Sequence, residues 1–222
     1  MIEKFELAGL IDHTLLKPYS SEHDIELICK EAIKYGFWSV CVNPNYVSLA
    51  SHFVRNTKVK VCSVLSFPFG ANTLEVKIHE AKKAIQDGAN EIDMVINLGA
   101  LRSGKYEIVR NEIEKVVEQG KSQRKTMIKV IIETGLLTEK EKTLACELVK
   151  KSGADFVKTS TGFNAPGATV SDVKLLRKIV GPDFGVKASG GIKTLNDALR
   201  LIDAGANRIG TSSGVAIIKE MI

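Results

Sequence analysis

The sequence has few of the residues that build disulfide-rich or metal-binding proteins. Its four cysteines lack C-x-x-C spacing and lie in apolar stretches: Cys29, Cys41, Cys62 and Cys146. Its four histidines form neither an H-x-H nor an H-E-x-x-H pattern: His13, His23, His52 and His79. We therefore expect no metal site and no disulfide framework, and reduced thiols favour a cytoplasmic location.

Long hydrophobic runs and one-sided charge are also missing. No run approaches the roughly 18 apolar residues of a membrane-spanning helix, and the N-terminal residues lack the basic region of a signal peptide. Lys and Arg exceed Asp and Glu by only 31 − 26 = 5, and the two signs alternate over residues 105–115 and 139–151. This pattern is typical of solvated helix faces, so we expect neither membrane nor nucleic-acid partners. The small positive excess suits an anionic small-molecule substrate.

Linkers, low-complexity tracts and internal repeats are absent as well. The chain is 44% hydrophobic and 26% charged, which is ordinary for a globular domain with a sizeable core. We therefore predict a single domain over residues 1–222.

What the sequence does contain is a regular alternation of two patterns. Eight short apolar runs predict strands: Leu10–Leu15, Ser39–Asn43, Lys60–Leu65, Glu91–Asn97, Met127–Glu133, Phe156–Ser160, Gly185–Ser189 and Arg208–Thr211. Eight segments with apolar residues at i, i+3 and i+4 predict helices: Glu22–Tyr35, Pro44–Val54, Leu74–Asp87, Lys105–Gln119, Glu139–Lys151, Val170–Val180, Leu195–Ala204 and Ser213–Met221. This alternation predicts an α/β chain whose parallel sheet closes into a (β/α)8 or TIM barrel. An open doubly wound sheet is the alternative, but no G-x-G-x-x-G follows the first strand.

Several helix boundaries carry signals of their own. Thr138, Thr169 and Thr194 each precede a helical pattern and have an acidic residue three positions later, which predicts N-caps. A Gly-Ala pair at residues 88–89, 153–154 and 205–206 stands between a helix and the next strand, where glycine can adopt a left-handed cap conformation.

In a barrel of this kind the reactive groups stand at the C-terminal ends of the strands. Alternate side chains of a strand share a face, so Asp93 should point into the barrel, together with Glu91, Val95 and Asn97. The alternate apolar residues Ile92, Met94 and Ile96 should face the helices. The same spacing turns Lys158 and Lys187 inward from consecutive strands.

The preceding strand places Lys129 and Glu133 on one face as well. Burying these charges costs several kcal/mol each unless they are paired. A structural ion-pair network filling one layer of the barrel is therefore one interpretation of the pattern.

The other interpretation is covalent catalysis by a lysine. A neutral amine can attack a carbonyl, and a second ammonium nearby or burial in the barrel disfavours the charged form of the first. Lys187 could act on Lys158 in this way, and Asp93 could relay protons to and from the hydroxyl groups of a bound sugar.

Glycine-rich turns follow the last two predicted strands, at residues 189–193 and 210–214. Loops at this position of a barrel commonly bind phosphate through backbone N–H groups. A Gly-Gly pair by itself is more often a tight turn, so the position in the chain is what favours an anion site.

The sequence resembles the deoxyribose-phosphate aldolase family in six segments, which cover essentially the whole chain: residues 11–14, 39–44, 91–97, 129–135, 156–163 and 186–192. The resemblance implies reversible cleavage of 2-deoxy-D-ribose 5-phosphate to D-glyceraldehyde 3-phosphate and acetaldehyde, with no cofactor. It also implies that Lys158 forms the Schiff base, that Lys187 tunes it and that Asp93 transfers protons.

The resemblance further implies a phosphate site made by Gly162, Gly190, Gly191, Ser212 and Ser213. Supporting positions would be Asp12, Thr14, Cys41, Lys129 and Thr159. Some relatives carry a lysine where this chain has Phe163, so Lys193 and backbone donors are the remaining candidates for phosphate contacts. Barrels of this kind often form a homodimer or homotetramer, to which Phe5, Trp38 and Tyr46 could contribute if exposed.

Two rival functions stay open from the sequence. Another Schiff-base sugar-phosphate aldolase, such as a transaldolase-like barrel, would use the same lysine on a different substrate. A non-catalytic barrel that binds a phosphorylated metabolite is the second, although buried unpaired lysines would then serve no purpose.

Overall fold

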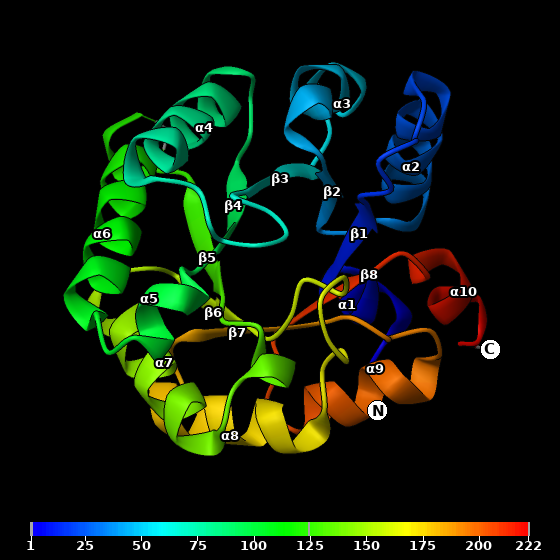
Figure 1. The fold of residues 1–222 in the computed structure, drawn as a ribbon. Coiled ribbons are helices and arrows are strands. Elements are labelled where there is room, and N and C mark those ends of the chain that lie inside the picture. Colours follow the sequence, from blue (N-terminus) through cyan, green and yellow to red (C-terminus); the bar gives the residue numbers. More distant parts are fainter. Residues whose placement is uncertain (1, 124, 222) are drawn as a thin grey trace.

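The computed structural model describes residues 2–123 and 125–221, and it confirms the predicted barrel. Its eight strands are β1 (Ile11–Leu15), β2 (Ser39–Val42), β3 (Lys60–Leu65), β4 (Glu91–Val95), β5 (Met127–Ile131), β6 (Phe156–Lys158), β7 (Gly185–Ser189) and β8 (Arg208–Thr211). They pair in parallel in the order of the chain, and β8 returns to β1 to close the ring. Figure 1 shows the ring of strands at the centre of the molecule, with the helices around its outside.

Eight helices carry the chain from strand to strand or close the ring: α2 (Glu22–Tyr35), α3 (Val47–Phe53), α4 (Leu74–Gln86), α6 (Tyr106–Gln123), α7 (Glu139–Lys151), α8 (Val170–Val180), α9 (Leu195–Asp203) and α10 (Gly214–Lys219). Four short pieces were not predicted as separate elements: α1 (Lys4–Ala8), α5 (Leu98–Arg102), η1 (Pro44–Tyr46) and η2 (Thr134–Leu136). The predicted helix at Pro44–Val54 is thus a 3-10 turn followed by α3.

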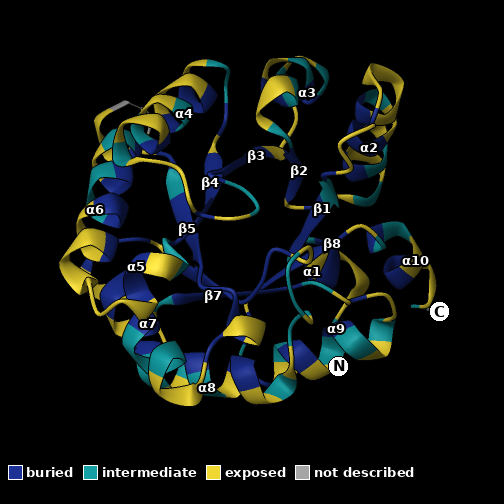
Figure 2. Ribbon diagram, viewed as in Figure 1, coloured by how far each residue is buried: buried dark blue, intermediate teal, exposed yellow. Residues whose placement is uncertain are grey.

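The apolar core lies between the strands and the helix ring. Ile92 and Met94 of β4 are fully buried there, as the alternation along the strand predicts. Figure 2 shows buried residues on the strands and inner helix faces, and exposed ones on the outer faces. The lumen is filled instead by charged and polar side chains, which makes it the unusual part of the molecule.

The predicted helix caps are confirmed. The side chain of Thr138 accepts a hydrogen bond from the N–H of Glu141, and Thr169 and Thr194 do the same for the residues three positions on. Gly88, Gly153 and Gly205 all have positive φ, in agreement with their predicted place after a helix.

Five strands are shorter than predicted: β1 and β2 by one residue each, and β4, β5 and β6 by two residues at their C-terminal ends. The strand predicted to reach Asn97 ends at Val95, because the Asn97 side chain accepts from the N–H of Ala100 and starts α5. Its amide nitrogen also donates to Glu112 outside the lumen, so the prediction that Asn97 shares the inward face with Asp93 is wrong.

The strand predicted to reach Glu133 ends at Ile131, and Glu133 itself has a left-handed backbone, with φ 55°. The strand predicted to reach Ser160 ends at Lys158. Both changes occur at the mouth of the barrel, where the chain turns out of the sheet.

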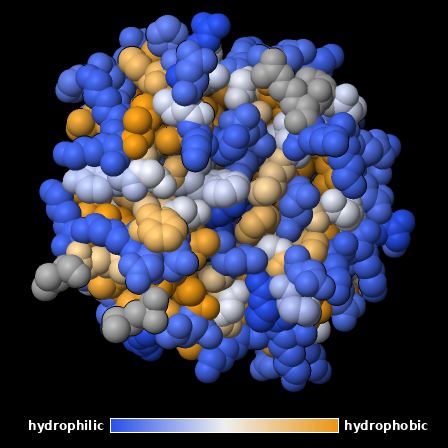
Figure 3. Space-filling model, turned by 180° about the vertical axis from the view of Figure 1, so that it is seen from behind, coloured by the Kyte–Doolittle hydropathy of each residue, from blue (hydrophilic) through white to orange (hydrophobic). Residues whose placement is uncertain are grey.

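No helix in the part of the chain that the structure describes is long and apolar enough to cross a membrane. The face opposite to that of Figure 1 shows hydrophilic side chains with hydrophobic ones between them (Figure 3).

Candidate active site

Asp93 stands at the centre of the barrel and is fully buried. The register places Lys129 opposite Asp93 on the next strand, and Lys158 opposite Lys187 on the two strands beyond. Lys158 and Lys187 donate to Asp93 Oδ2 at 2.8 and 2.7 Å, and Lys129 donates to Oδ1 at 2.8 Å. One carboxylate therefore accepts hydrogen bonds from three lysine side chains.

A second carboxylate, Asp12 on β1, extends the same network. It forms ion pairs with Lys187 and with Arg208, the latter at 3.0 Å, and it accepts a hydrogen bond from Ser39 at 2.7 Å. Glu91 completes the layer below, at 2.6 Å from Lys129 and 3.1 Å from Arg208. The interpretation of the pattern as an ion-pair network is thus correct as a description of the contacts.

The network fixes the charge of its members. Burial alone would raise the pKa of Asp93, but the ammonium groups of Lys129, Lys158 and Lys187 outweigh it and hold this pKa well below its usual range. Burial alone would lower the pKa of Lys187, but Asp12 and Asp93 outweigh it and raise that pKa. Asp93 is therefore ionised and Lys187 protonated at neutral pH.

We expect this network to make the fold acid-sensitive. Asp12, like Asp93, has its pKa lowered, because the charges of Lys187, Lys129 and Arg208 outweigh burial. A depressed carboxyl pKa contributes stability above the unfolded value of about 4, and this contribution is lost as the pH falls further. The contribution of these two carboxyls to the free energy of unfolding in urea should thus be constant above about pH 5 and fall below about pH 4. Asp12→Asn should make the fall in the free energy of unfolding below about pH 4 less steep, and an equally steep fall in this variant would contradict the argument.

Lys158 is the member of the network that reaches a cavity. This cavity, of about 220 Å³, is lined by Lys158 and by the loops that follow β1, β6, β7 and β8. Lys129, Lys187 and Arg208 are not among its lining residues. Within the described chain the network joins four cationic side chains to three carboxylates, so it is neutral when Lys158 is neutral.

Four of the five predicted phosphate residues line this cavity. Gly162, Gly190, Gly191 and Ser212 line it, and the three glycines have φ of 83°, 88° and 76°, which favours residues without a side chain. Ser213 does not line it; its N–H donates to the hydroxyl of Thr211 at 2.9 Å. Lys193 also lines the cavity and Phe163 forms part of its wall.

Comparison with known proteins agrees with this geometry. Residues 7–220 match the DeoC/LacD family of aldolases. The chain belongs to this family. It is 58% identical to the deoxyribose-phosphate aldolase of Thermococcus kodakarensis over 220 residues, which is 98% of each chain. It is 56% identical to that of Enterococcus faecalis over 213 residues, 96% of each chain.

A solved structure shows the same fold for this aldolase family. The deoxyribose phosphate aldolase from Aeropyrum pernix, described as a tetramer of unique structure, superimposes with a TM-score of 0.92 at 38% identity. The match covers 98% of this chain and 92% of that one.

The supporting positions of the aldolase differ in their exposure to the cavity. Thr14 lines it. Thr159 is buried between strands, where its hydroxyl donates to the carbonyl of Ser189 and accepts from the N–H of the same residue. Asp12 and Lys129 act within the ion network described above. Lys17 and Leu16 line the cavity and were not predicted, because a turn after β1 carries no pattern that marks it as a wall.

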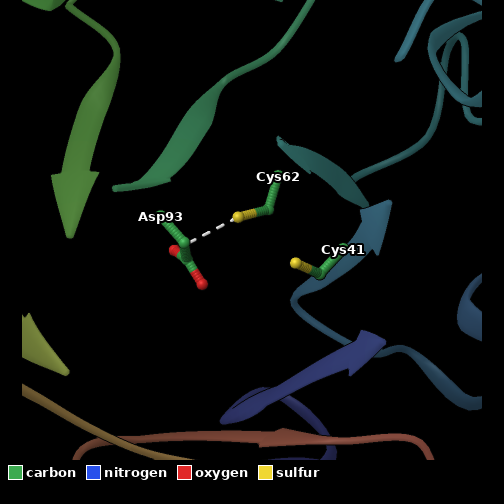
Figure 4. A group of neighbouring side chains, drawn as sticks. All are labelled: Cys41, Cys62 and Asp93. Atoms are coloured by element: carbon green, nitrogen blue, oxygen red, sulfur yellow. Dashed lines mark hydrogen bonds between the residues drawn. The ribbon is translucent and has the colours of Figure 1, made fainter. Parts of the chain in front are cut away.

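Cys41 lies beside Asp93, together with Cys62 on the adjacent strand (Figure 4). The three ligand atoms lie within 4.8 Å of one another, a spacing that could suit a soft metal ion. However, Lys129 donates to both Asp93 and Cys62, at 2.8 and 3.4 Å, and two more ammonium groups take the second oxygen of Asp93. A cation already occupies this place, so the cluster belongs to the lumenal ion network.

The two thiols differ in acidity. The neighbouring Cys62 thiol lowers the pKa of Cys41, in spite of the complete burial of Cys41. Burial raises the pKa of Cys62 well above its usual range. Cys41 is therefore the more acidic thiol of the aldolase lumen.

Gly167 packs so closely against Gly190 that it leaves no room for a side chain. A Cβ added to Gly167 would lie 2.0 Å from the carbonyl oxygen of Gly190. We expect Gly167→Ala to displace the loop of Gly190, to cost about 1–3 kcal/mol of stability and to raise KM for a phosphorylated substrate. Gly99→Ala is the control, because its nearest neighbour is 3.6 Å away. Equal thermal melting temperatures and KM values for the two variants would refute the close-packing argument.

Proposed function

We propose that this chain is a deoxyribose-phosphate aldolase that cleaves 2-deoxy-D-ribose 5-phosphate reversibly to D-glyceraldehyde 3-phosphate and acetaldehyde. The observation that carries the proposal is the position of Lys158, between the lumenal ion network and the glycine loops of one cavity. A substrate that fills this cavity presents its aldehyde carbon to the amine and its phosphate to the loops.

Lys158 attacks in its neutral form. Its Nζ bonds to the aldehyde carbon of the open-chain sugar, and loss of water gives an iminium ion. The bond between the second and third carbons then breaks as the hydroxyl on the third carbon gives up its proton. The electron pair moves to the iminium, glyceraldehyde 3-phosphate leaves and an enamine remains on Lys158.

Asp93 and Lys187 handle the protons. Asp93 is ionised and can accept a proton through water, and Lys187 is protonated and can donate one. Protonation of the enamine at its terminal carbon and addition of water release acetaldehyde and restore the amine.

The phosphate group is held by the turns that follow β6, β7 and β8. Gly162, Gly190 and Gly191 bring backbone N–H groups close to the anion, with Ser212 and Lys193 as side-chain donors. Ser213 contributes by starting α10 behind these donors. The excess of basic residues over the whole chain attracts such a substrate.

The proposal also includes a homo-oligomeric assembly and a cytoplasmic location. A homodimer or homotetramer fits the tetramer described for the Aeropyrum pernix relative, and Phe5, which is 76% exposed, is available for a contact. Trp38 is engaged within its own chain, where it covers the Arg208 guanidinium and donates to Glu91. Four free, buried cysteines fit a reducing compartment such as the cytoplasm.

The test is turnover of deoxyribose 5-phosphate, followed by an enzyme-coupled assay of glyceraldehyde 3-phosphate. We expect turnover, and in a second sample we expect borohydride with acetaldehyde to attach two carbons to Lys158. Turnover of a longer ketose phosphate alone would establish another Schiff-base aldolase instead. Binding of a phosphorylated sugar with no adduct would establish a non-catalytic barrel.

A further inference from the structure

Glu133 is a buried carboxylate that the mechanism above does not use. Its side chain is fully buried, and no Lys, Arg or His forms an ion pair with it within residues 2–123 and 125–221. A buried charge without a cation is costly unless hydrogen bonds replace the water that it has lost. The sequence placed Glu133 beside Lys129 in the lumen, but its left-handed backbone turns it towards a loop instead.

Among the residues that the structure describes, all of the hydrogen bonds to this carboxylate come from one loop. The N–H of Thr161 donates to both oxygens, at 3.1 and 3.3 Å, and its hydroxyl donates to Oε2. The side-chain amide of Asn164 donates to Oε2 at 3.4 Å. Residues 161 and 164 belong to the loop between β6 and α8, which begins directly after Lys158.

This loop forms one wall of the cavity. Thr161, Gly162 and Phe163 all line it, and the hydroxyl of Thr161 also accepts from the N–H of Phe163 at 3.1 Å. Asn164 extends the tie to a further loop, since its amide donates to the carbonyl of Pro68 at 2.7 Å. Phe163 packs edge-on against Phe67 of that same loop.

We propose that Glu133 is a positioning residue for phosphate recognition, which fixes the β6–α8 loop so that the N–H groups around Gly162 point at the phosphate. A carboxylate suits this task because all its partners are donors, and hydrogen bonds to a charged group are among the stronger ones. Glu133 lies outside the Asp93 network, so it acts on the binding of the phosphate end and leaves the amine chemistry to the lumen. This inference rests on the proposed function for its substrate.

The test separates binding of phosphate from chemistry. Glu133→Gln keeps the shape of the side chain but turns an NH2 group towards hydrogen-bond donors. The β6–α8 loop therefore loses at least one of its hydrogen bonds to this side chain. We expect KM for deoxyribose 5-phosphate and the inhibition constant of inorganic phosphate to rise about tenfold. The rate at which borohydride traps the acetaldehyde adduct, which involves no phosphate, should stay the same. Asp155→Asn is the matched control, since Asp155 also accepts a backbone N–H, that of Ile128 at 2.8 Å, away from the cavity lining.

A second pair of variants covers the case in which Glu133→Gln does not fold. Thr161→Val removes the hydroxyl that bonds to Glu133, and Thr161→Ser keeps it. We expect Thr161→Val to raise KM about threefold or more and Thr161→Ser to restore it. Unchanged KM in both Glu133→Gln and Thr161→Val would overturn the proposal, and so would an adduct rate that falls in step with kcat.

The proposed function and this inference can fail separately. If the unaltered chain does not cleave deoxyribose 5-phosphate, the function is wrong. The role of Glu133 in phosphate binding is then still tested by the affinity for inorganic phosphate, measured by calorimetry. Equal phosphate affinity in the unaltered chain and in Glu133→Gln would overturn the positioning role on its own.

Discussion

Lys158→Ala is expected to abolish the borohydride-trapped acetaldehyde adduct and to lower kcat by about 10⁵-fold or more, because covalent catalysis has no other amine in the cavity close to Asp93. The fold should survive the change. Asp93 keeps Lys129 and Lys187 as partners, so no buried carboxylate is left without a cation. Peptide mass spectrometry of the reduced adduct and a thermal melt check both statements.

Lys193→Ala is the matched control for this experiment. Lys193 is another lysine of the cavity wall, but its backbone lies in the glycine turn after β7, at the phosphate end. We expect this variant to form the adduct normally and to bind phosphate less tightly. An adduct on Lys187, or turnover by Lys158→Ala close to that of the unaltered chain, would show that the nucleophile has been assigned wrongly.

The charged centre of the barrel could be predicted because strand geometry is regular. Alternate residues of a strand share a face, so Asp93, Lys158 and Lys187 were placed in the lumen from their spacing alone. Their actual contacts depend on register between strands, which a single sequence does not contain. The role of Asp12 as a second partner of Lys187, beside Arg208, is therefore visible only in the structure.

Predictions failed where a strand gives way to a loop. Asn97 and Glu133 were assigned by extending the alternation, but an amide cap ends one strand and a left-handed residue follows the other. Each of these residues then bonds to a helix or loop outside the lumen. Side-chain hydrogen bonds to nearby backbone compete with strand pairing, and the periodicity of apolar residues gives no sign of which will prevail.

The phosphate end was predicted from position in the chain, and its five residues from the resemblance to the aldolase family. Glycine turns after the last two strands of a barrel are a recurrent anion site, and four of the five residues assigned line the cavity. Ser213 is the exception, because its N–H bonds to Thr211 and α10 begins directly after it. A change of one residue in the length of a turn decides which N–H or hydroxyl group faces the ligand, and the residue composition of the turn does not determine that length.

Lys187→Met is expected to lower kcat by about 10²–10⁴-fold, the range for loss of a proton-transfer residue. Lys187 is a cation held between Asp12 and Asp93, at 2.7 Å from the same Asp93 oxygen that Lys158 contacts. Methionine keeps much of its length and removes its charge. Loss of a neighbouring positive charge favours the protonated form of the remaining amine, so the acidic limb of the pH–rate profile should move to higher pH.

Stability must be separated from chemistry in this variant, because removing one partner of a buried ion pair costs about 3–5 kcal/mol. Lys77→Met provides the comparison: Lys77 is also fully buried and paired with a carboxylate, that of Glu112, but it lies between α4 and α6, outside the barrel. Both variants should melt at lower temperature, while only Lys187→Met should lose turnover per folded molecule and shift its pH profile. Equal loss of activity in the two variants, or an unshifted pH–rate profile in Lys187→Met, would show that Lys187 stabilises the fold only. Some other group would then have to favour the neutral amine of Lys158.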